Sequence, residues 1–456
     1  MDATAALAHF VSQIDYAQLP TAARDMARQS LLDGLGVALA GSQEQCGEII
    51  AGYVRGEGAA RQATIVGLGL RTSTTLAALA NGTLAHALDF DDFTPAFMSH
   101  TTVSLMPALL ALGELRHISG RQAIAAYAAG YEVQARVGLA TGPGHYEMGW
   151  HSTSTLGALG AAAAAGRVLG LTGGQMTHAL GMAASGAGGL RQNFGTMTKP
   201  LHAGLAASHG VRSALLASKG FTADADILAS PFGFCRVLGA PGESRPEALT
   251  KDLGERYYLA ECGVDIKPYP SCRETHRCLD AVLHLVRTHS FQPEQVAQVE
   301  CHTSAMIPHI VIHQHARTVL EGKFCMPFCM AVAIVDRAAG LDQFTDTRLH
   351  DPRVQSLMGK VRFLHPPEDT GRLEDLARPE MVAVRLTNGE TYSRSVAKAL
   401  GSPGNPMPQD MLWAKYRQCA SRALPPAVVE RSLEMLAHLD DVPDVASLMA
   451  IVAGGP

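Results

Sequence analysis

Apolar residues recur at helical spacing through most of the first 260 positions of the chain. Small residues accompany this spacing, and they let helices pack closely, in stretches such as LAALANGTLAHAL and LGALGAAAAAGRVLGL. The pattern predicts a large, almost entirely α-helical domain. After GSPGNP, two further helices that pack back on this domain are predicted by the amphipathic segments MLWAKYRQCASRAL and AVVERSLEMLAHL.

A different pattern begins near residue 267, where Pro268 and Pro270 interrupt the helical spacing. Strand-like alternation follows in VAQVECHTSAMI, and two strands joined by an Asn-Gly turn are expected in MVAVRLTNGETYSRSV. The predicted fold class is therefore mainly α with a smaller α+β domain. We expect residues 1–266 and 396–456 to form the large helical domain, and residues 267–395 to form the α+β domain.

Composition agrees with two globular domains and excludes several partners. The chain has 456 residues, of which 47% are hydrophobic and 17% charged, so it can bury a large core. A net charge of −5 without a long Lys/Arg cluster predicts neither a nucleic-acid nor a membrane partner. The N-terminus lacks the basic region of a signal peptide, and charged residues or glycines cut every long apolar run. We therefore expect a cytoplasmic protein with reduced cysteines.

One short stretch, HALDFDDFTPAFMSHTT at 86–102, holds three aspartates and two histidines between apolar runs. Asp89 follows a predicted helix, and the loop after it returns His100 before another helix that begins near Pro107. These groups could serve chemistry. They could equally solvate one helix end and cap the next, and the residues alone leave both interpretations open.

Two further stretches place polar groups at predicted helix starts. Tyr146 and His151 precede a Ser/Thr-rich helix start in GHYEMGWHSTSTLGALGAAAA, where unbonded backbone N–H groups favour an anion. Lys199 and His202 begin a small-residue helix in NFGTMTKPLHAGLAASHG. Lysine is scarce in this chain, and an ammonium in an apolar setting suits the carboxylate of a substrate.

A fourth polar stretch, DIKPYPSCRETHRCLDA, lies where the pattern changes from one domain to the next. Lys267 stands just before the change, and Arg273 and His276 follow it. Small ligands often bind between domains, so these side chains are candidate binding residues.

These stretches together resemble the MmgE/PrpD family. The resemblance is carried in order by LLDGLGVALAGS, HALDFDD with a following histidine, GWHSTSTLGALGAAAA, GTMTKPLHAG, KPYPSCRETHRCLDA and EGKFCMPFCMAVAIVD. It implies a large helical domain completed by the C-terminal helices, an inserted α+β lid domain, a homodimer, and an active site that uses no metal or organic cofactor.

The resemblance also implies which residues act. Five of them fall on catalytic positions of the family: Asp89, His100, His151, Lys199 and Lys267. Two departures bear on the substrate. Thr94 stands one place after the position where relatives often carry threonine, and Phe328 stands where cis-aconitate decarboxylases have a functional tyrosine.

Proton removal next to a carboxylate explains why these residue types occur together. The reaction builds negative charge on the carboxylate, so it needs a base for the carbon acid and cations for the charge. His100 or His151 suits the base, and Lys199 and Lys267 suit the carboxylates of a small di- or tricarboxylate. Asp89 is expected to orient a histidine or to help a hydroxyl leave.

The fate of the carbanion-like intermediate decides the reaction. Loss of a β-hydroxyl is dehydration, reprotonation on the other face is epimerisation, and loss of carbon dioxide is decarboxylation. We favour a lyase of the 2-methylcitrate dehydratase type, with an epimerase of the iminodisuccinate type next and a cis-aconitate type decarboxylase third, since Phe328 lacks the phenol.

Two other classes remain as alternatives. HIVIHQH places His309, His313 and His315 at a spacing that could bind a metal, which would indicate a metal-dependent hydrolase. An iron–sulfur dehydratase is disfavoured because no C-x-x-C pair occurs. A non-catalytic helical scaffold, in which the histidines and lysines only satisfy core or cap positions, would bind carboxylates weakly or not at all.

Overall fold

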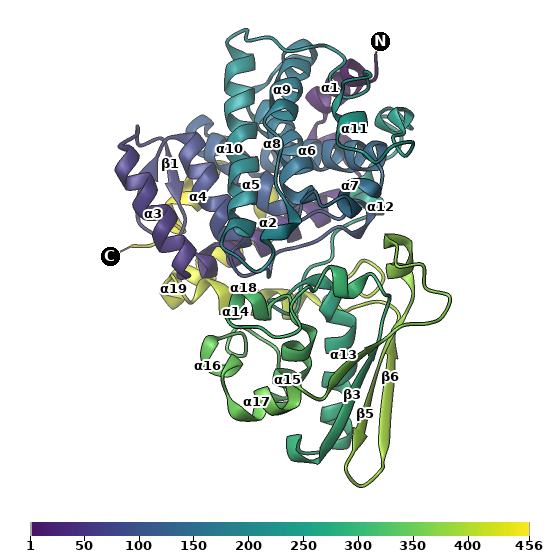
Figure 1. Cartoon of the computed structure of the whole chain (residues 1–456). Coiled ribbons are helices and arrows are strands. Elements are labelled where there is room, and N and C mark those ends of the chain that lie inside the picture. The colour runs from purple at the N-terminus through teal and green to yellow at the C-terminus, as the bar shows by residue number, and fades with distance from the viewer. Residues whose placement is uncertain (1, 456) are drawn as a thin grey trace. The chain divides into compact units, whose positions relative to one another are not determined.

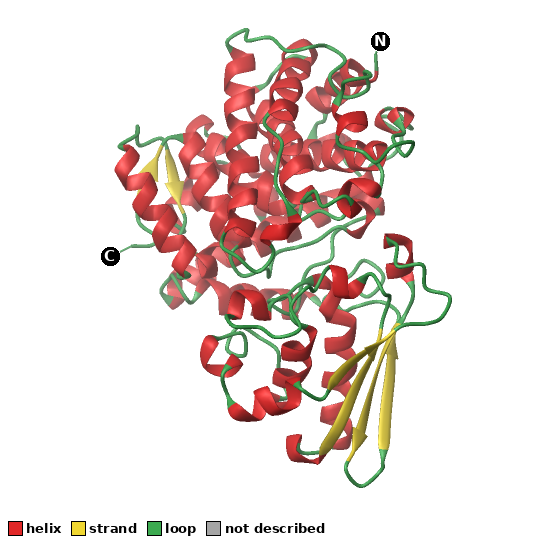
Figure 2. Cartoon of the chain, in the orientation of Figure 1, coloured by secondary structure: helices red, strands yellow, loops and turns green. Residues whose placement is uncertain are grey.

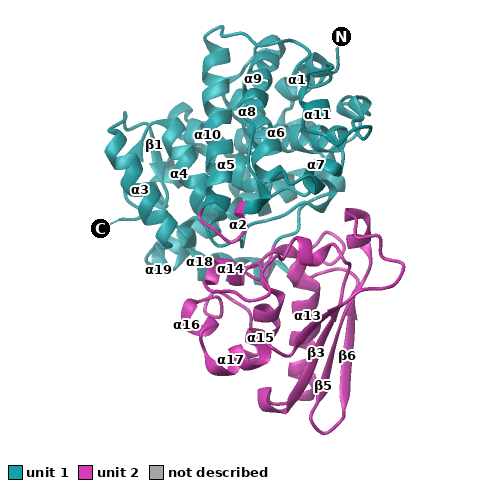
Figure 3. Ribbon diagram, viewed as in Figure 1, with its two compact units in different colours: residues 1–192, 198–266, 408–456 teal, residues 193–197, 267–407 magenta. Residues whose placement is uncertain are grey.

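The chain divides into two compact units in the computed structural model, which describes residues 2–455 (Figure 3). Unit 1 comprises the described residues up to Gln192, together with Thr198–Ile266 and the residues from Pro408 onward. Unit 2 comprises Asn193–Met197 and Lys267–Met407.

Unit 1 is built almost entirely from helices (Figures 1 and 2). Its helices are α1 Ala3–Gln13, α2 Thr21–Gly41, α3 Gln45–Glu57, α4 Thr74–His86, α5 Thr102–Arg116, α6 Gly120–Thr141, α7 Gly144–Glu147, α8 Ser152–Leu169, α9 Gly173–Ser185, α10 Thr198–Ser218, α11 Phe234–Val237, α12 Tyr258–Glu261, α18 Gln409–Ala420, α19 Pro426–Ala437 and α20 Val445–Ile451. Between residues 2 and 455, no helix combines the length and the apolar character needed to cross a membrane.

Small residues bring the central helices of unit 1 close together. Helix α10 packs against both α8 and α4, and Figure 1 shows α8 and α10 side by side. A β-carbon added at Gly82 of α4 would lie 2.8 Å from the Cα of Gly204 on α10, so both positions require glycine for this approach. The close packing matters for the site because α4 and α10 each carry part of it.

Unit 2 combines a four-stranded sheet with short helices. The strands are β3 Val296–His302, β4 Val361–Leu364, β5 Glu380–Leu386 and β6 Thr391–Val396, in the order β4-β3-β5-β6. β3 pairs with β4 in parallel and with β5 antiparallel, and β5 and β6 form the hairpin around the Asn-Gly turn. The helices are α13 His276–His289, α14 Val319–Gly322, α15 Met326–Asp336, α16 Asp346–Leu349 and α17 Pro352–Met358, and α13 packs against β5 and β6.

The predicted fold class, mainly α with a smaller α+β part, is confirmed (Figure 2). Two local features differ from the prediction. The short antiparallel strands β1, Ala63–Ile65, and β2, Leu70–Thr72, interrupt the helices of unit 1. Helix α5 begins at Thr102 and not near Pro107, because the Asp92 carboxylate accepts from the Thr102 N–H and so caps the helix earlier.

Candidate active site

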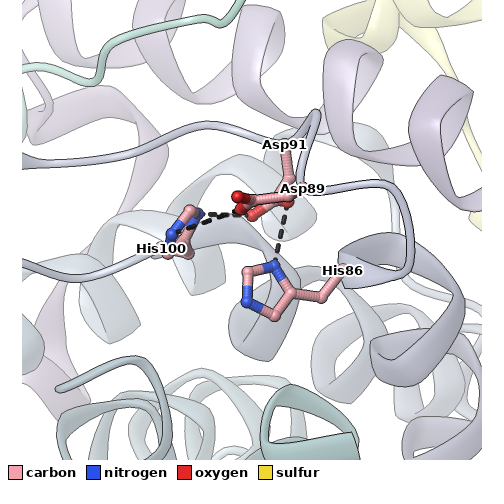
Figure 4. A group of neighbouring side chains, drawn as sticks. All are labelled: His86, Asp89, Asp91 and His100. Carbon is pink, nitrogen blue, oxygen red and sulfur yellow. Dashed lines mark hydrogen bonds and ion pairs between the residues drawn. The ribbon is translucent and has the colours of Figure 1, made fainter. Parts of the chain in front are cut away.

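The candidate site of unit 1 is built around the 87–101 loop, which connects α4 to α5. Asp89 has a φ of +51°, in the left-handed region that most side chains avoid and that aspartate tolerates better than most. The chain turns at this residue directly after α4. As a result His86 at the end of α4, Asp89 and Asp91 in the loop, and His100 before α5 come together in one buried cluster (Figure 4).

Asp91 joins the two histidines of this cluster. One carboxylate oxygen lies 2.9 Å from Nδ1 of His86, and the other lies 2.8 Å from Nδ1 of His100 (Figure 4). Burial alone would raise the pKa of Asp91, but the charges and hydrogen bonds of the two imidazoles hold it well below its usual value. An ionised carboxylate only accepts, so both Nδ1 atoms carry protons, and the lone pair of a neutral ring then lies on Nε2.

Lys199, at the start of α10, reaches the same cluster. Its Nζ lies 2.8 Å from Nε2 of His86 and 2.8 Å from Oδ1 of Asp89. Burial lowers the pKa of His86, so its neutral ring accepts from the ammonium. Nε2 of His100 is 3.8 Å from the same Asp89 oxygen. The arrangement therefore places a basic imidazole nitrogen and an ammonium on either side of one carboxylate.

Two further histidines extend the cluster. His151, the residue before α8, has Nδ1 3.0 Å from Nδ1 of His202 on α10. Burial, followed by the charge of Lys199, lowers the pKa of His151 well below its usual value, and burial lowers that of His202 to about 4. Both imidazoles are therefore neutral near pH 7, and one of them donates to the other.

The loop residues Phe93 and Thr94 lie next to the cluster in different ways. The ring of Phe93 is edge-on to that of His100, with 5.1 Å between centroids. The hydroxyl of Thr94 donates to the carbonyl of Gly263 at 3.4 Å, and its backbone pairs with Ser99. Thr94 thus holds the loop in shape, while Phe93 contacts the catalytic candidate.

Tyr146 lies on α7, beside the segment that leads to His151. Its ring faces the guanidinium of Arg191 at 3.9 Å, and the same guanidinium donates to the Tyr146 carbonyl at 2.9 Å. These contacts tie α7 to the segment after α9.

The remaining four candidates belong to unit 2. Lys267 is buried and is the first residue of the 267–407 segment. Nη1 of Arg273 lies 3.8 Å from the carboxylate of Glu274. Nε2 of His276 lies 3.1 Å from a backbone carbonyl. Phe328 on α15 is fully buried, with its ring edge-on to Phe344 at 5.4 Å. The structure therefore groups four of the ten candidates, Asp89, His100, His151 and Lys199, within unit 1.

Three residues of the cluster were not among the candidates: His86, Asp91 and His202. Asp89 was expected to orient a histidine, but Asp91 makes the direct hydrogen bonds to both Nδ1 atoms, and Asp89 pairs with Lys199. A signal was present in the sequence. His86 and Asp91 stand in the same polar stretch as Asp89, where an apolar setting predicts that each charge has a partner.

The cluster also has the residue types of a metal site. Donor atoms of His86, Asp89, Asp91 and His100 all lie within 4.8 Å of one another. The ammonium of Lys199, however, already contacts His86 and Asp89, and Asp91 already accepts from both imidazoles. A cation bound by these atoms would compete with Lys199 for them.

The alternative metal motif in HIVIHQH does not assemble. Among the described residues, no group of three or more potential ligands includes His309, His313 or His315. His313 instead lies near a backbone carbonyl, with Nε2 3.4 Å from the oxygen of Phe194. In the part of the chain that the structure describes, these three histidines therefore do not form a metal-binding group.

A helical unit with a buried cluster of imidazoles, carboxylates and a lysine defines a protein with acid–base groups in its core. Comparison with known families agrees: the MmgE/PrpD N-terminal domain matches residues 5–247, and the MmgE/PrpD C-terminal domain matches residues 269–441. The chain belongs to the MmgE/PrpD family of enzymes, as the resemblance predicted.

Three relatives that match over most of their length are each named cis-aconitate decarboxylase. Cis-aconitate decarboxylase of Mus musculus is 28% identical over 440 residues, which cover 94% of this chain and 88% of the mouse protein. The human enzyme of the same name is 28% identical over 441 residues, with 94% and 90% covered. That of Aspergillus terreus is 27% identical over 485 residues, with 98% and 95% covered. The similarity thus extends over both units.

Proposed function

We propose that this protein is a lyase that transfers a proton at a carbon next to a carboxylate of a small di- or tricarboxylate, without a metal or organic cofactor. The observation that carries the proposal is Asp91, whose two oxygens fix the Nδ1–H tautomer of His86 and of His100. A histidine held in this tautomer by a buried carboxylate has the arrangement of a general base.

Each residue has a role in this proposal. Nε2 of His100 removes or returns the proton, and Asp91 orients the ring and stabilises the imidazolium that forms. Lys199, held by Asp89, supplies the positive charge for the carboxylate on which electrons collect. We assign Lys267, Arg273 and His276 to further carboxylates of the substrate, and His151 to a second proton-transfer position. Thr94, Tyr146 and Phe328 are proposed to shape the binding site.

Dehydration fits these roles. His100 takes the proton, the electron pair of the C–H bond forms the double bond, and the β-hydroxyl leaves with a proton from Lys199 as water. Phe328 supports this choice over decarboxylation, because the aligned tyrosine of the resemblance is absent and a phenylalanine ring offers no proton. We therefore propose a hydro-lyase of the 2-methylcitrate dehydratase type.

Decarboxylation is the second candidate, and the names of the full-length relatives favour it. Here the bond between carbon and carboxylate breaks, carbon dioxide leaves, and the electron pair left on carbon takes a proton from Nε2 of His100, which acts in this reaction as the imidazolium after taking a proton from water. The same residues serve both reactions, so the chemistry of the substrate decides between them.

Product analysis separates the two candidates. The purified protein is incubated with 2-methylcitrate, citrate, cis-aconitate, iminodisuccinate and tartrate in turn, with and without a chelator, and products are identified by mass spectrometry and NMR. A new alkene with loss of water supports the hydro-lyase, and released carbon dioxide supports the decarboxylase. Inverted configuration without loss of mass would indicate an epimerase. Turnover that a chelator abolishes would contradict the proposed independence from metal.

We also propose a homodimer, because the family resemblance implies one. Light scattering during size-exclusion chromatography is expected to give twice the chain mass of 48.1 kDa. A mass equal to one chain at micromolar concentration would contradict this assignment.

A further inference from the structure

Lys415, on helix α18, contacts the 87–101 loop at Phe90. Its Nζ lies 2.8 Å from the carbonyl oxygen of Phe90 and 2.6 Å from Oδ1 of Asp33 on α2. The same ammonium lies 4.0 Å from the centroid of the Phe90 ring. Lysine is rarely buried, and this one is 7% exposed, so its charge is satisfied almost entirely by these three groups.

Successive residues of the loop alternate between two sets of partners. Asp89 and Asp91 contact the lysine and histidines of the cluster. Phe90 contacts Lys415, and Asp92 accepts hydrogen bonds from the backbone and hydroxyl of Thr102 at the start of α5. The loop therefore has one face in the candidate site and one face in the core of unit 1.

The position of the bonded carbonyl gives the contact its significance. The oxygen of Phe90 belongs to the planar peptide unit that also contains the N–H and Cα of Asp91. Holding this oxygen fixes the plane from which the Asp91 side chain extends. Since Asp91 sets the tautomer of His86 and of His100, an error in this plane is transmitted to both imidazoles.

We propose that Lys415 is a positioning residue of the candidate active site, with Asp33 as its counter-charge. Lys415 contacts neither the imidazoles nor the ammonium of Lys199; it acts through the backbone of the loop. The inference rests on the proposed function only for its activity measurements, because the hydrogen bonds of Asp91 can be observed without a substrate.

The decisive variants are Lys415→Met and the double variant Lys415→Met/Asp33→Asn. The single variant leaves a buried carboxylate without its cation, and the double variant removes that charge while the carbonyl of Phe90 still lacks its donor. The matched control is Arg136→Met. Arg136 is also a buried cation of unit 1, bound to a carboxylate and to the carbonyls of Lys251 and Arg256, outside the loop.

Two measurements are made on each variant. NMR follows the imidazole N–H protons shared with Asp91, which are assigned by their loss in His86→Gln and His100→Gln. In Lys415→Met we expect both resonances to shift and to exchange with water at least tenfold faster, and kcat to fall about 10- to 100-fold with KM within about threefold, the scale of a small misplacement of catalytic groups. In Arg136→Met the melting temperature falls, while resonances and kcat stay as in the wild type.

The double variant separates positioning from stability. We expect it to regain most of the melting temperature and none of the kcat. Wild-type resonances and kcat in Lys415→Met would overturn the proposal, as would equal losses in Arg136→Met, recovery of kcat in the double variant, or the absence of both N–H resonances from the wild type. If no carboxylate is turned over while the resonances respond as expected, the proposed function fails and the positioning role stands.

Discussion

Asp91 contacts two imidazoles with its two oxygens, and this single carboxylate sets which nitrogen of each ring carries a proton. Each Nδ1 proton is shared with Asp91, so Nε2 is the other ring nitrogen in each case, and it contacts Lys199 in His86 and lies 3.8 Å from Asp89 in His100. A pKa held well below the usual value keeps Asp91 ionised across the neutral range. Both imidazoles therefore keep their Nδ1 protons near pH 7.

Asp91→Asn tests this role with little change of shape. An amide offers one acceptor oxygen, so one of the two imidazoles must lose its Nδ1 partner and can adopt the other tautomer. We expect kcat to fall by about 10² to 10⁴ with a small change in KM, as for other carboxylates that orient a catalytic histidine. Steady-state kinetics on the substrate that the product analysis identifies measures this. Glu114→Gln, which alters a buried carboxylate bonded to Thr64, serves as control and should retain wild-type kcat.

Lys199→Met and Lys267→Met test the proposed binding of carboxylates. Each variant replaces the charged lysine by an uncharged side chain of similar length. We expect substrate binding or turnover to weaken by about 1 to 3 kcal/mol, the scale of a charge-assisted hydrogen bond. The matched control is Lys219→Met, because Lys219 is an exposed lysine just after α10. Wild-type kinetics in both test variants would show that these lysines are structural.

At the scale of elements, the contact between α4 and α10 brings His86 to Lys199. These residues are 113 positions apart, and their helices meet where Gly82 faces Gly204. A β-carbon at Gly204 would clash with the carbonyl of Leu79 and the hydroxyl of Thr83, both on α4. The helices could accommodate it only by moving apart.

Gly204→Ala is therefore expected to destabilise the protein by about 1 to 3 kcal/mol, the scale of an overpacked core, and to lower kcat. Chemical denaturation and kinetics measure the two effects. The control is Gly52→Ala in α3, where an added β-carbon meets no atom within 4 Å and should stabilise by about 0.5 to 1 kcal/mol. A neutral effect of Gly204→Ala on both stability and kcat would contradict the importance of this approach.

Asp92 links the loop to α5, and burial raises its pKa to about 7, above the usual value of 3.8. The folded protein therefore binds one more proton at this residue than the unfolded chain does between these values. The stability that the protonated group contributes is complete below pH 3.8 and is lost as the pH rises through 7.

Asp92→Asn removes this titration. The difference in free energy of unfolding between the wild type and the variant should fall by about 2 to 3 kcal/mol from pH 5 to pH 8. Urea denaturation at several pH values tests the prediction, and Glu114→Gln controls for loss of a buried carboxylate. A difference that is constant with pH, or that grows as the pH rises, would contradict the raised pKa.

The elements that the sequence predicted are those with a long, regular pattern. The helices α4 and α8, the strand β3 and the β5–β6 hairpin all occur where periodicity or turn chemistry placed them. β1 and β2 are three residues long, too short for alternation to be recognised. The start of α5 was misplaced because its cap comes from Asp92, a side chain ten positions away that no local pattern connects to Thr102.

For the whole molecule, the sequence indicated the buried polar cluster of unit 1 better than it indicated the contacts within that cluster. The polar stretch at 86–102 and Lys199 are recognisable in the sequence because charged groups in apolar surroundings need partners. Spacing reveals neither the left-handed turn at Asp89 nor the two Nδ1 contacts of Asp91. His202 joins the cluster by its contact with His151, which is 51 positions away in the sequence, so no local pattern predicts it.

The central claim is that His100, held by Asp91, moves a proton to or from carbon, and solvent deuterium tests it most directly. The wild-type protein is incubated in deuterated water with its substrate, and deuterium in the substrate or product is followed by mass spectrometry. We predict incorporation by the wild type that falls by about 10² or more in His100→Asn and is also reduced in His151→Asn, since these imidazoles carry the proton. Incorporation that persists undiminished in both folded variants would contradict the account.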